Sequence, residues 1–536
     1  MAIVGESGSG KSVTALSVLR LLPNTVRYPK GEIFFSPDGQ TATNLLLEKE
    51  KNLRSIRGNQ AAMIFQEPMT SLNPVFTCGN QVMETIQLHQ KLSAAEAKNR
   101  TIALFEKVKL PNPSLLFNRY PHQLSGGQKQ RVMIAMAMSC NPSLLICDEP
   151  TTALDVTVQK TILQLLKELQ QTTQMGVIFI THDLGVVAEI ADRAVVMYKG
   201  AIVEQGDAKK IFTQPQHPYT KGLLACRPVL HQKGERLPIV SDFIREDDPG
   251  YIGNFTKPQP IIQSTTRIIQ QSQNILLSTD QLSIWFPTKK NILGKPLAFT
   301  KAVDKVSFNV FEGETLGLVG ESGCGKTTLG RALLRLIEPS SGKIFYKGTE
   351  LTAQSIASLK PLRKEIQIIF QDPYSSLNPR LSIGDALAEP LKVHRIINDA
   401  RQRRDKVVEL LEKVNMKAEH LHRYPHEFSG GQRQRIVIAR ALALGPSFIV
   451  CDESVSALDV SVQAQVLNLL NDLKKEFGFT IIFISHDLSV VRYISDRIMV
   501  MNNGRIEEIG EAEQVYHHPL TEYTRQLIRS IPGQNI

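Results

Sequence analysis

Two glycine-rich segments have the residue types and spacing of a phosphate-binding loop. GESGSGKS occupies residues 5–12 and GESGCGKT occupies residues 320–327. Glycines let backbone N–H groups point at phosphate oxygens, and the helix that follows adds its positive end. We expect Lys11 and Lys326 to reach the β- and γ-phosphates of ATP, and the hydroxyls of Ser12 and Thr327 to bind Mg²⁺. The predicted ATP-binding residues are Gly5, Glu6, Ser7, Gly8, Ser9, Gly10, Lys11, Ser12, Gly320, Glu321, Ser322, Gly323, Cys324, Gly325, Lys326, Thr327 and Thr328.

Two pairs of acidic residues follow short apolar runs and could serve phosphoryl transfer. The runs end at Asp148-Glu149 and at Asp452-Glu453. A buried strand of that length delivers both carboxylates to its carboxyl end, where doubly wound sheets bind ligands. The first acid of each pair would hold Mg²⁺ through water. The second would orient the attacking water, because phosphoryl transfer depends on positioning and charge neutralisation.

Other apolar runs end near polar residues that could complete such a site. His182 and His486 could sense the γ-phosphate, and Gln66 and Gln371 could contact the metal and the water. One such residue alone is more often a polar group facing solvent at a strand end. Their repeated occurrence beside a phosphate loop favours the functional interpretation. The predicted catalytic residues are Glu149, His182, Glu453 and His486, and the predicted metal-site residues are Ser12, Gln66, Asp148, Thr327, Gln371 and Asp452.

A third kind of segment, LSGGQ at 124–128 and FSGGQ at 428–432, precedes a long apolar helix in each half. A Ser-Gly-Gly turn at a helix N-terminus can bind an anion, although alone it is more often an ordinary helix cap. The candidate residues are Ser125, Gly126, Gly127, Gln128, Ser429, Gly430, Gly431 and Gln432.

All these segments occur twice, 315 residues apart at the glycine loop and 304 or 305 residues apart elsewhere. This constancy indicates a duplicated domain with a short insertion early in the first copy. Apolar strands are predicted at 2–4 and 316–319, helices at 13–22 and 328–337, and mainly helical inserts at about 70–141 and 375–445. The predicted fold class is α/β, with two tandem P-loop domains.

The predicted domains are 1–230 and 281–536, joined by a linker at 231–280 that is rich in Gln, Ser, Thr and Pro. The second copy has about 40 residues before its glycine loop, including the strand–turn–strand pattern KAVDKVSFNVFEGETLGLVG. The first copy begins almost at the loop and has no counterpart of this pattern. A start codon assigned too late, or a truncated gene, is the simplest interpretation.

The composition limits the alternatives. The chain has 536 residues, 42% of them hydrophobic and 21% charged, with a formal net charge of +10. A basic surface suits phosphates or an anionic membrane leaflet, but the charge decides neither. The six cysteines form no CxxC pair and no Cys/His cluster, so no zinc site, iron–sulfur centre or disulfide framework is expected. No apolar run reaches the roughly 20 residues of a membrane span, so a membrane role would be peripheral.

Taken in order, these motifs resemble the ATP-binding cassette (ABC) family over nearly the whole chain. The Ser-Gly-Gly-Gln segment between the glutamine and the Asp-Glu strand is specific to that family. The resemblance makes the glycine loops Walker A, Asp148/Glu149 and Asp452/Glu453 Walker B with the catalytic glutamate, and Asp155 and Asp459 the D-loop. It implies a RecA-like core, an antiparallel β subdomain and a helical subdomain in each copy, with the antiparallel β subdomain largely missing in the first.

The same resemblance implies that two cassettes close head to tail around two ATP molecules. One site would pair the loop of Lys11 with the signature at 429–432, and the other would pair the loop of Lys326 with the signature at 125–128. Neither copy lacks its glutamate or histidine, so both sites are expected to hydrolyse ATP.

A narrower resemblance concerns the ends of the cassettes. QPQHPYTKGLL at 214–224, echoed by HHPLTEYTRQLI at 517–528, is similar to the tail of oligopeptide, dipeptide and nickel importer ATPases. Two cassettes in one chain resemble the fused members of that group, which include Yej-type peptide and microcin C importers and glutathione importers. The implied partners are two transmembrane permeases and a periplasmic or extracellular solute-binding protein. The implied location is the cytoplasmic face of the inner membrane, with no nucleic-acid partner.

Two other classes stay open. A tandem cassette protein acting on ribosomes or nucleic acid would usually carry a long charged helical linker, zinc modules or coiled coils, and none is evident. An inactive truncated remnant would fit the short first copy but not its intact catalytic set. The transported solute cannot be read from an ATPase subunit, so peptide, glutathione, a nickel chelate and a peptide antibiotic all remain possible.

Overall fold

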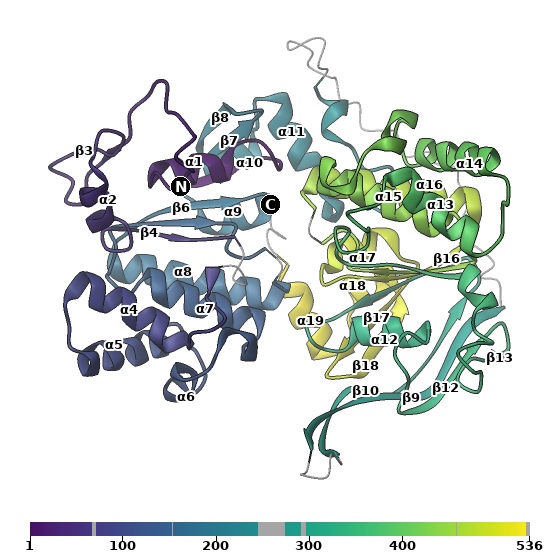
Figure 1. Ribbon diagram of the computed structural model, residues 1–536. Coiled ribbons are helices and arrows are strands. Elements are labelled where there is room, and N and C mark those ends of the chain that lie inside the picture. The colour runs from purple at the N-terminus through teal and green to yellow at the C-terminus, as the bar shows by residue number, and fades with distance from the viewer. Residues whose placement is uncertain (67–70, 153, 245–273, 291–295, 457, 532–536) are drawn as a thin grey trace. The chain divides into compact units, whose positions relative to one another are not determined.

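The computed structural model describes residues 1–536 except 67–70, 153, 245–273, 291–295, 457 and 532–536. The described chain forms two compact units, residues 1–224 and residues 225–531. Each unit contains one of the two predicted cassettes, and each is described by itself (Figure 1).

The first unit is built on a six-stranded sheet. Its order is β4(Ala61–Ile64)-β5(Leu144–Asp148)-β6(Gly176–Thr181)-β1(Ala2–Val4)-β7(Arg193–Tyr198)-β8(Ala201–Asp207). The first five strands are parallel and β8 pairs antiparallel with β7. Strand β1 lies in the interior, with Ile3 paired to Ile180 on one side and Val195 on the other. The loop after β1 therefore emerges from the middle of the sheet, where doubly wound folds bind ligands.

Helices cover this sheet and form a separate helical layer in the first unit (Figure 1). The helices are α1(Lys11–Val18), α2(Glu50–Ile56), α4(Cys78–Gln90), α5(Ala94–Lys107), α6(Pro113–Phe117), α7(Gly126–Ala137), α8(Val156–Thr173), α9(Leu184–Ile190), α10(Ala208–Thr213) and α11(Pro218–Ala225). Phe105, Val132 and Ile162 belong to one buried cluster that joins this layer to the sheet. The predicted helical insert of the first copy is confirmed from α4 to α7, although residues 67–70 at its start lie outside the described residues.

The second unit repeats the same sheet order, β14(Ile366–Ile369)-β15(Phe448–Asp452)-β16(Thr480–Ile484)-β11(Thr315–Val319)-β17(Arg497–Asn502)-β18(Arg505–Glu511). Its helices are α12(Lys326–Leu333), α13(Ile383–Val393), α14(Ala400–Lys413), α15(Gly430–Leu442), α16(Val460–Phe477), α17(Leu488–Ile494), α18(Ala512–His517) and α19(Glu522–Arg529). The α/β class and the duplication are thereby confirmed in the described residues.

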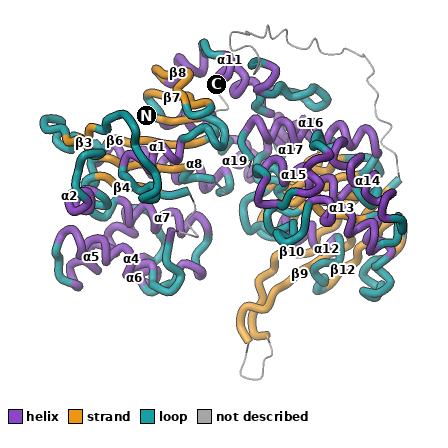
Figure 2. The backbone as a smooth tube through the Cα atoms, turned by 45° about the horizontal axis from the view of Figure 1, so that its top comes forward, coloured by secondary structure: helices purple, strands orange, loops and turns teal. Residues whose placement is uncertain are grey.

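A four-stranded antiparallel sheet distinguishes the second unit. Its order is β10(Pro296–Phe311)-β9(Ile275–Lys290)-β12(Ser341–Tyr346)-β13(Thr349–Glu350), and Figure 2 shows the end of the β9–β10 ribbon extending from the unit. In the first unit the described counterpart is the short pair β2(Phe34–Phe35) and β3(Thr43–Asn44). The antiparallel subdomain is thus largely confined to the second copy, as its sequence predicts.

The segment after α11 differs from the predicted linker. Residues 225–243 belong to the second unit, where Leu237 is fully buried. The side chain of Asn468 on α16 accepts a hydrogen bond from Leu237 N at 2.9 Å and donates one to Leu237 O at 2.8 Å. Tyr493 on α17 donates to Glu235 O at 2.7 Å. The polar composition at 245–273 supported the linker prediction, but those residues lie outside the described part of the chain.

No helix in the described part of the chain has the length and apolar character that a membrane span requires. The six cysteines are all reduced and buried.

Candidate functional site

The glycine loop of the first unit connects β1 to α1. Gly10 caps α1 with a φ of 98°, and Gly5 has a φ of 152°. A Cβ at Gly5 would lie 2.2 Å from Met197 O, so only glycine fits where the loop leaves the sheet. Lys11 is buried and its Nζ donates to Gly5 O at 2.8 Å and to Glu6 O at 2.9 Å. The lysine therefore spans its own loop.

The loop of the second unit repeats this geometry between β11 and α12. Gly320 has a φ of 152° and its Cβ would lie 2.1 Å from Met501 O. Lys326 Nζ donates to Gly320 O at 2.7 Å and to Glu321 O at 2.9 Å. Two independent copies with the same contacts indicate that the fold imposes this geometry.

A hydroxyl and a carboxylate meet at the base of each loop. Ser12 Oγ donates to Asp148 Oδ1 at 3.0 Å, and Thr327 Oγ1 donates to Asp452 Oδ1 at 2.8 Å. Burial raises the pKa of both aspartates above the ordinary value, which disfavours the bare carboxylate. Hydroxyl and carboxylate oxygens are the ligands that Mg²⁺ prefers, and a divalent cation would offset the cost of the buried charge. This donor set fits Mg²⁺.

Glu149 lies at the centre of a polar cluster in the first unit. Its Oε2 accepts from Gln66 Nε2 at 3.1 Å and from Thr152 Oγ1 at 2.9 Å, and it lies 3.2 Å from His182 Nδ1. Burial alone would raise the pKa of this carboxyl, but the hydrogen bond and charge of His182, the hydrogen bond from Thr152 and the charge of Lys11 together outweigh burial and lower the pKa to about 2. Glu149 is therefore ionised at neutral pH, as a group that orients water must be.

Glu453 has the equivalent neighbours in the second unit. Its Oε2 accepts from Gln371 Nε2 at 2.9 Å and lies 3.5 Å from His486 Nδ1. Burial opposes ionisation here too, but His486 outweighs burial and the pKa of Glu453 is lowered. Both glutamates have left-handed backbone conformations, with φ of 46° at Glu149 and 48° at Glu453. Such conformations cost energy in non-glycine residues and are often found at functional sites.

The Ser-Gly-Gly turns are helix caps with a packing requirement. Ser125 and Ser429 cap α7 and α15, each accepting from the backbone N–H of the glutamine three residues later at 3.4 Å. Both serines are exposed. A Cβ at the second glycine would lie 2.7 Å from Val158 Cγ1 in the first unit. The turn is thus a cap whose polar groups remain accessible to a ligand.

The D-loop aspartates begin the helices after the Asp-Glu strands. Asp155 caps α8, accepting from Val158 N at 2.8 Å and from Thr157 Oγ1 at 2.7 Å. Asp459 occupies the same position before α16. The contacts of Asp155 are those of a helix N-cap, which is a structural role.

The structure thus brings each loop lysine, hydroxyl, aspartate, glutamate, glutamine and histidine together within its own unit. The sequence did not single out Thr152, which bonds Glu149, or Arg331, whose guanidinium lies 3.6 Å from Asp452 Oδ2. Thr152 lies three residues after Glu149, and that closeness to the Asp-Glu pair was a signal the motif search did not use. For Arg331 the sequence held no indication of a role at the site beyond its position in α12, the helix that follows the second glycine loop.

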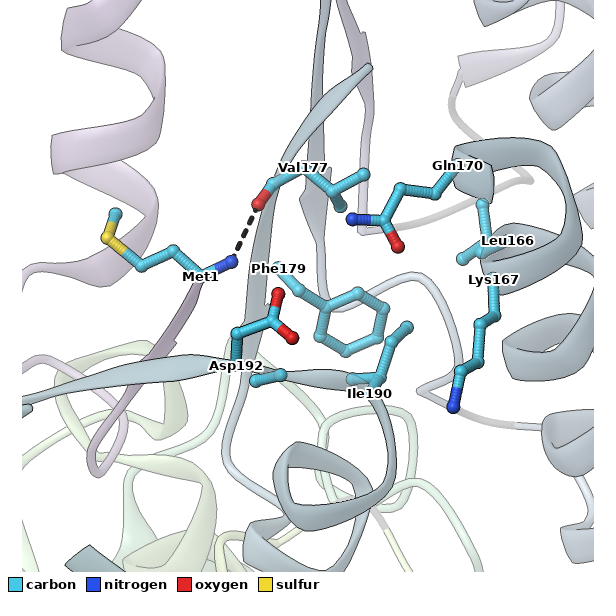
Figure 3. A pocket seen from close by; sticks show the side chains of 9 residues that line it. Met1, Leu166, Lys167, Gln170, Val177, Phe179, Ile190 and Asp192 are labelled. Atoms are coloured by element: carbon cyan, nitrogen blue, oxygen red, sulfur yellow. Dashed lines mark hydrogen bonds between the residues drawn. The ribbon is translucent and has the colours of Figure 1, made fainter. Parts of the chain in front are cut away.

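A separate pocket lies at the opposite end of β1. Figure 3 shows Met1, Gln170, Phe179, Ile190 and Asp192 lining it, with the Met1 amino group donating to Val177 O at 3.0 Å. Met1 is at the amino end of β1 whereas the glycine loop leaves its carboxyl end, so this pocket is not part of the candidate site.

Family comparison agrees with this geometry. The ABC transporter family model matches residues 1–152 and 303–456, and the model for the C-terminal region of oligopeptide/dipeptide transporters matches residues 203–243 and 508–535. The chain belongs to the ABC transporter family, and it is an ATPase of that family. Its C-terminal regions belong to the oligopeptide/dipeptide transporter type.

Individual relatives are similar over nearly the whole chain. The glutathione import ATP-binding protein GsiA of Escherichia coli (strain K12) is 50% identical over 536 residues, which covers 99% of this chain and 84% of the relative. The protein of the same name in Pectobacterium atrosepticum is 49% identical over 536 residues, which likewise covers 99% of this chain and 84% of the relative. A solved dimeric structure of the ATP-binding cassette MJ0796 bound to ADP and Pi has 26% identity, a TM-score of 0.40, and covers 44% of this chain and 98% of its own.

Proposed function

We propose that this chain is the motor of an importer in which the two cassettes bind two ATP molecules at composite head-to-tail sites. The observation that carries the proposal is the presence, in both units, of the same complete set around the glycine loop. Each set has a lysine that spans the loop, a hydroxyl–aspartate pair, and a glutamate held by glutamine and histidine. The loop of one cassette would take the Ser-Gly-Gly turn of the other.

Each group has a defined part in hydrolysis. Lys11 and Lys326 contact the β- and γ-phosphates. The loop carbonyls take two of the three ammonium hydrogens of Lys11, and the third is left for a phosphate oxygen. In the second loop Lys326 also contacts Cys324 Sγ at 3.9 Å, a weak acceptor that a phosphate oxygen would replace. Mg²⁺, when bound, neutralises charge that develops between these phosphates. Glu149 and Glu453 accept a hydrogen bond from the attacking water and aim it in line with the leaving oxygen. Gln66 and Gln371 fix the carboxylates by hydrogen bonds.

The histidines and the signatures complete the mechanism. His182 and His486 contact both the glutamate and the γ-phosphate, so they would register the phosphate's presence. The exposed Ser125 and Ser429 supply hydroxyl and backbone donors to the γ-phosphate bound on the other cassette. Two halves would therefore close when ATP is present and separate after it is cleaved.

The transported solute is proposed to be a small peptide, with glutathione as the first candidate. Support comes from the 50% identity to a glutathione import ATP-binding protein and from the two C-terminal regions of oligopeptide/dipeptide transporter type. The partners are two transmembrane permeases and a solute-binding protein. The chain would act at the cytoplasmic face of the membrane, where the helical subdomains (α4–α7 and α13–α15) receive the permeases.

The hydrolysis part is tested on the purified full-length chain. Glu149→Gln and Glu453→Gln, made separately, are expected to lower MgATP hydrolysis because each removes the carboxylate that orients water. An unchanged rate from either variant would refute the assignment for that cassette.

The transport part is tested in a bacterium that lacks its own glutathione import ATP-binding protein. Expression of this chain with the permease and solute-binding genes that neighbour its own gene should restore ATP-dependent uptake of labelled glutathione, and Lys11→Ala combined with Lys326→Ala should abolish it. Uptake of labelled peptides but not glutathione would assign a different solute, and uptake of neither would refute the importer proposal.

A further inference from the structure

One tyrosine in the tail of each cassette reaches the glycine loop of the same cassette. Tyr219 on α11 accepts a hydrogen bond from Glu6 N at 2.9 Å, and Tyr523 on α19 accepts one from Glu321 N at 3.1 Å. The two tyrosines lie more than 200 residues from the loops that they contact, and 304 residues from each other. We infer that Tyr219 and Tyr523 are positioning residues for the loop lysines, so that the tail of each cassette sets its affinity for ATP.

The tyrosine and the lysine bond opposite edges of one peptide group. Gly5 C=O and Glu6 N–H belong to the same planar unit and point in opposite directions. Lys11 Nζ donates to Gly5 O at 2.8 Å, while Glu6 N donates to Tyr219 Oη. The second cassette repeats this arrangement with Lys326, Gly320 O, Glu321 N and Tyr523. Rotating this peptide would therefore break both bonds together.

The orientation of this peptide decides which ammonium hydrogens are available to a nucleotide. A lysine ammonium has three donors, and Gly5 O and Glu6 O take two of them. The third remains for a phosphate oxygen. Gly5 has a φ of 152°, a conformation that glycine enters and leaves at little cost. A bond from outside the loop is thus needed to keep the peptide in one orientation.

A carboxylate on the last strand of each sheet holds the start of the tail helix that carries the tyrosine. Just before α11, Gln216 N and His217 N both donate to the Glu204 carboxylate on β8, at 2.9 and 3.1 Å. Just before α19, Leu520 N and Thr521 N donate to the Glu508 carboxylate on β18, at 2.9 and 3.3 Å. Each carboxylate thereby fixes the start of the helix that carries the tyrosine.

Packing around the first tyrosine supports a fixed position. Tyr219 is fully buried, and its ring lies 4.4 Å, centroid to centroid, from the ring of Tyr198. Tyr198 provides a matched control, because it is the same residue type in ring contact with Tyr219, and no hydrogen bond from its hydroxyl to the glycine loop is observed among the described residues.

The inference rests on the proposed ATP site, so the test isolates one cassette at a time. In the full-length chain carrying Lys326→Ala, the dissociation constant of MgATP is measured with and without Tyr219→Phe. We expect it to rise about fivefold to tenfold, the equivalent of one hydrogen bond. Tyr523→Phe in a Lys11→Ala chain should behave in the same way. Tyr198→Phe should leave the dissociation constant unchanged.

The outcomes separate the two proposals. If the Lys326→Ala chain binds no ATP, the ATP-site assignment fails for the first cassette. If it binds ATP and Tyr219→Phe changes the dissociation constant by less than about twofold, or Tyr198→Phe changes it as much, the positioning role is overturned. Thermal unfolding without nucleotide checks that the variants fold. Should Tyr219→Phe not fold, Glu204→Gln must weaken ATP binding in its place, and unaltered binding would overturn the inference.

Discussion

The local stability of the segment 231–243, which follows the first cassette, should depend on the side chain of Asn468 in the second unit. Asn468 is buried and makes both hydrogen bonds to the backbone of Leu237. Asn468→Ala would remove these two bonds, worth about 1 kcal/mol each, and a longer bond from Tyr493 Oη at 3.4 Å. It would also leave the buried N–H and C=O of Leu237 without these partners, at a further cost of about 1 kcal/mol or more. The bond from Tyr493 to Glu235 would remain. We expect a local destabilisation of about 2–4 kcal/mol.

Amide hydrogen exchange reads this change directly, because it reports local opening without requiring the whole chain to unfold. Since 1.4 kcal/mol is a factor of ten, exchange in the peptide covering 231–243 should accelerate about 30-fold or more. Gln164→Ala, at the equivalent and exposed position of α8, is the control and should leave this peptide unchanged. Full exchange of 231–243 at the unprotected rate in the unaltered chain would refute the docked arrangement, as would unaltered exchange in Asn468→Ala.

Other predictions concern packing, charge and metal. Gly431→Ala places a Cβ 2.2 Å from Val462 Cγ1, so it should destabilise the second unit by about 1–3 kcal/mol, measured by urea denaturation. The partners of Glu149, chiefly His182, lower its pKa to about 2, so the ionised carboxylate stabilises the first unit at pH values above its ordinary pKa of 4.5, and this stability is lost as the pH falls toward 2. Glu149→Gln should therefore flatten that part of the acid-unfolding curve in circular dichroism. Ser12→Ala should raise the Mg²⁺ concentration that half-saturates hydrolysis.

The motifs of the candidate site could be predicted from the sequence because the chemistry of each motif is local. Each motif is short: the lysine ends its own glycine loop and the two acids end a single strand, so the spacing within each motif predicts its local geometry. Contacts from residues far along the chain could not be predicted in this way. Tyr219 stood in a recognised tail motif, but nothing in that motif indicated a bond to Glu6, more than 200 residues away.

The linker prediction shows the complementary limit. Composition describes a long segment as a whole, whereas docking depends on single apolar residues such as Leu237 and on a partner such as Asn468 on another helix. Likewise, β9 begins at Ile275, inside the predicted linker, because its apolar residues pair with β10 and β12. Such long-range pairing is decided by tertiary packing and not by local composition.

The sharing of one ATP by two cassettes is tested most directly by crossing a catalytic variant with a signature variant. In a Glu453→Gln chain, single-turnover hydrolysis reports the site of Lys11 and Glu149. Ser429→Ala and Ser125→Ala remove caps with the same 3.4 Å bond, so each costs its own helix about 1 kcal/mol. We predict that Ser429→Ala abolishes the remaining hydrolysis while Ser125→Ala preserves it. Loss with Ser125→Ala and activity with Ser429→Ala would contradict the head-to-tail arrangement.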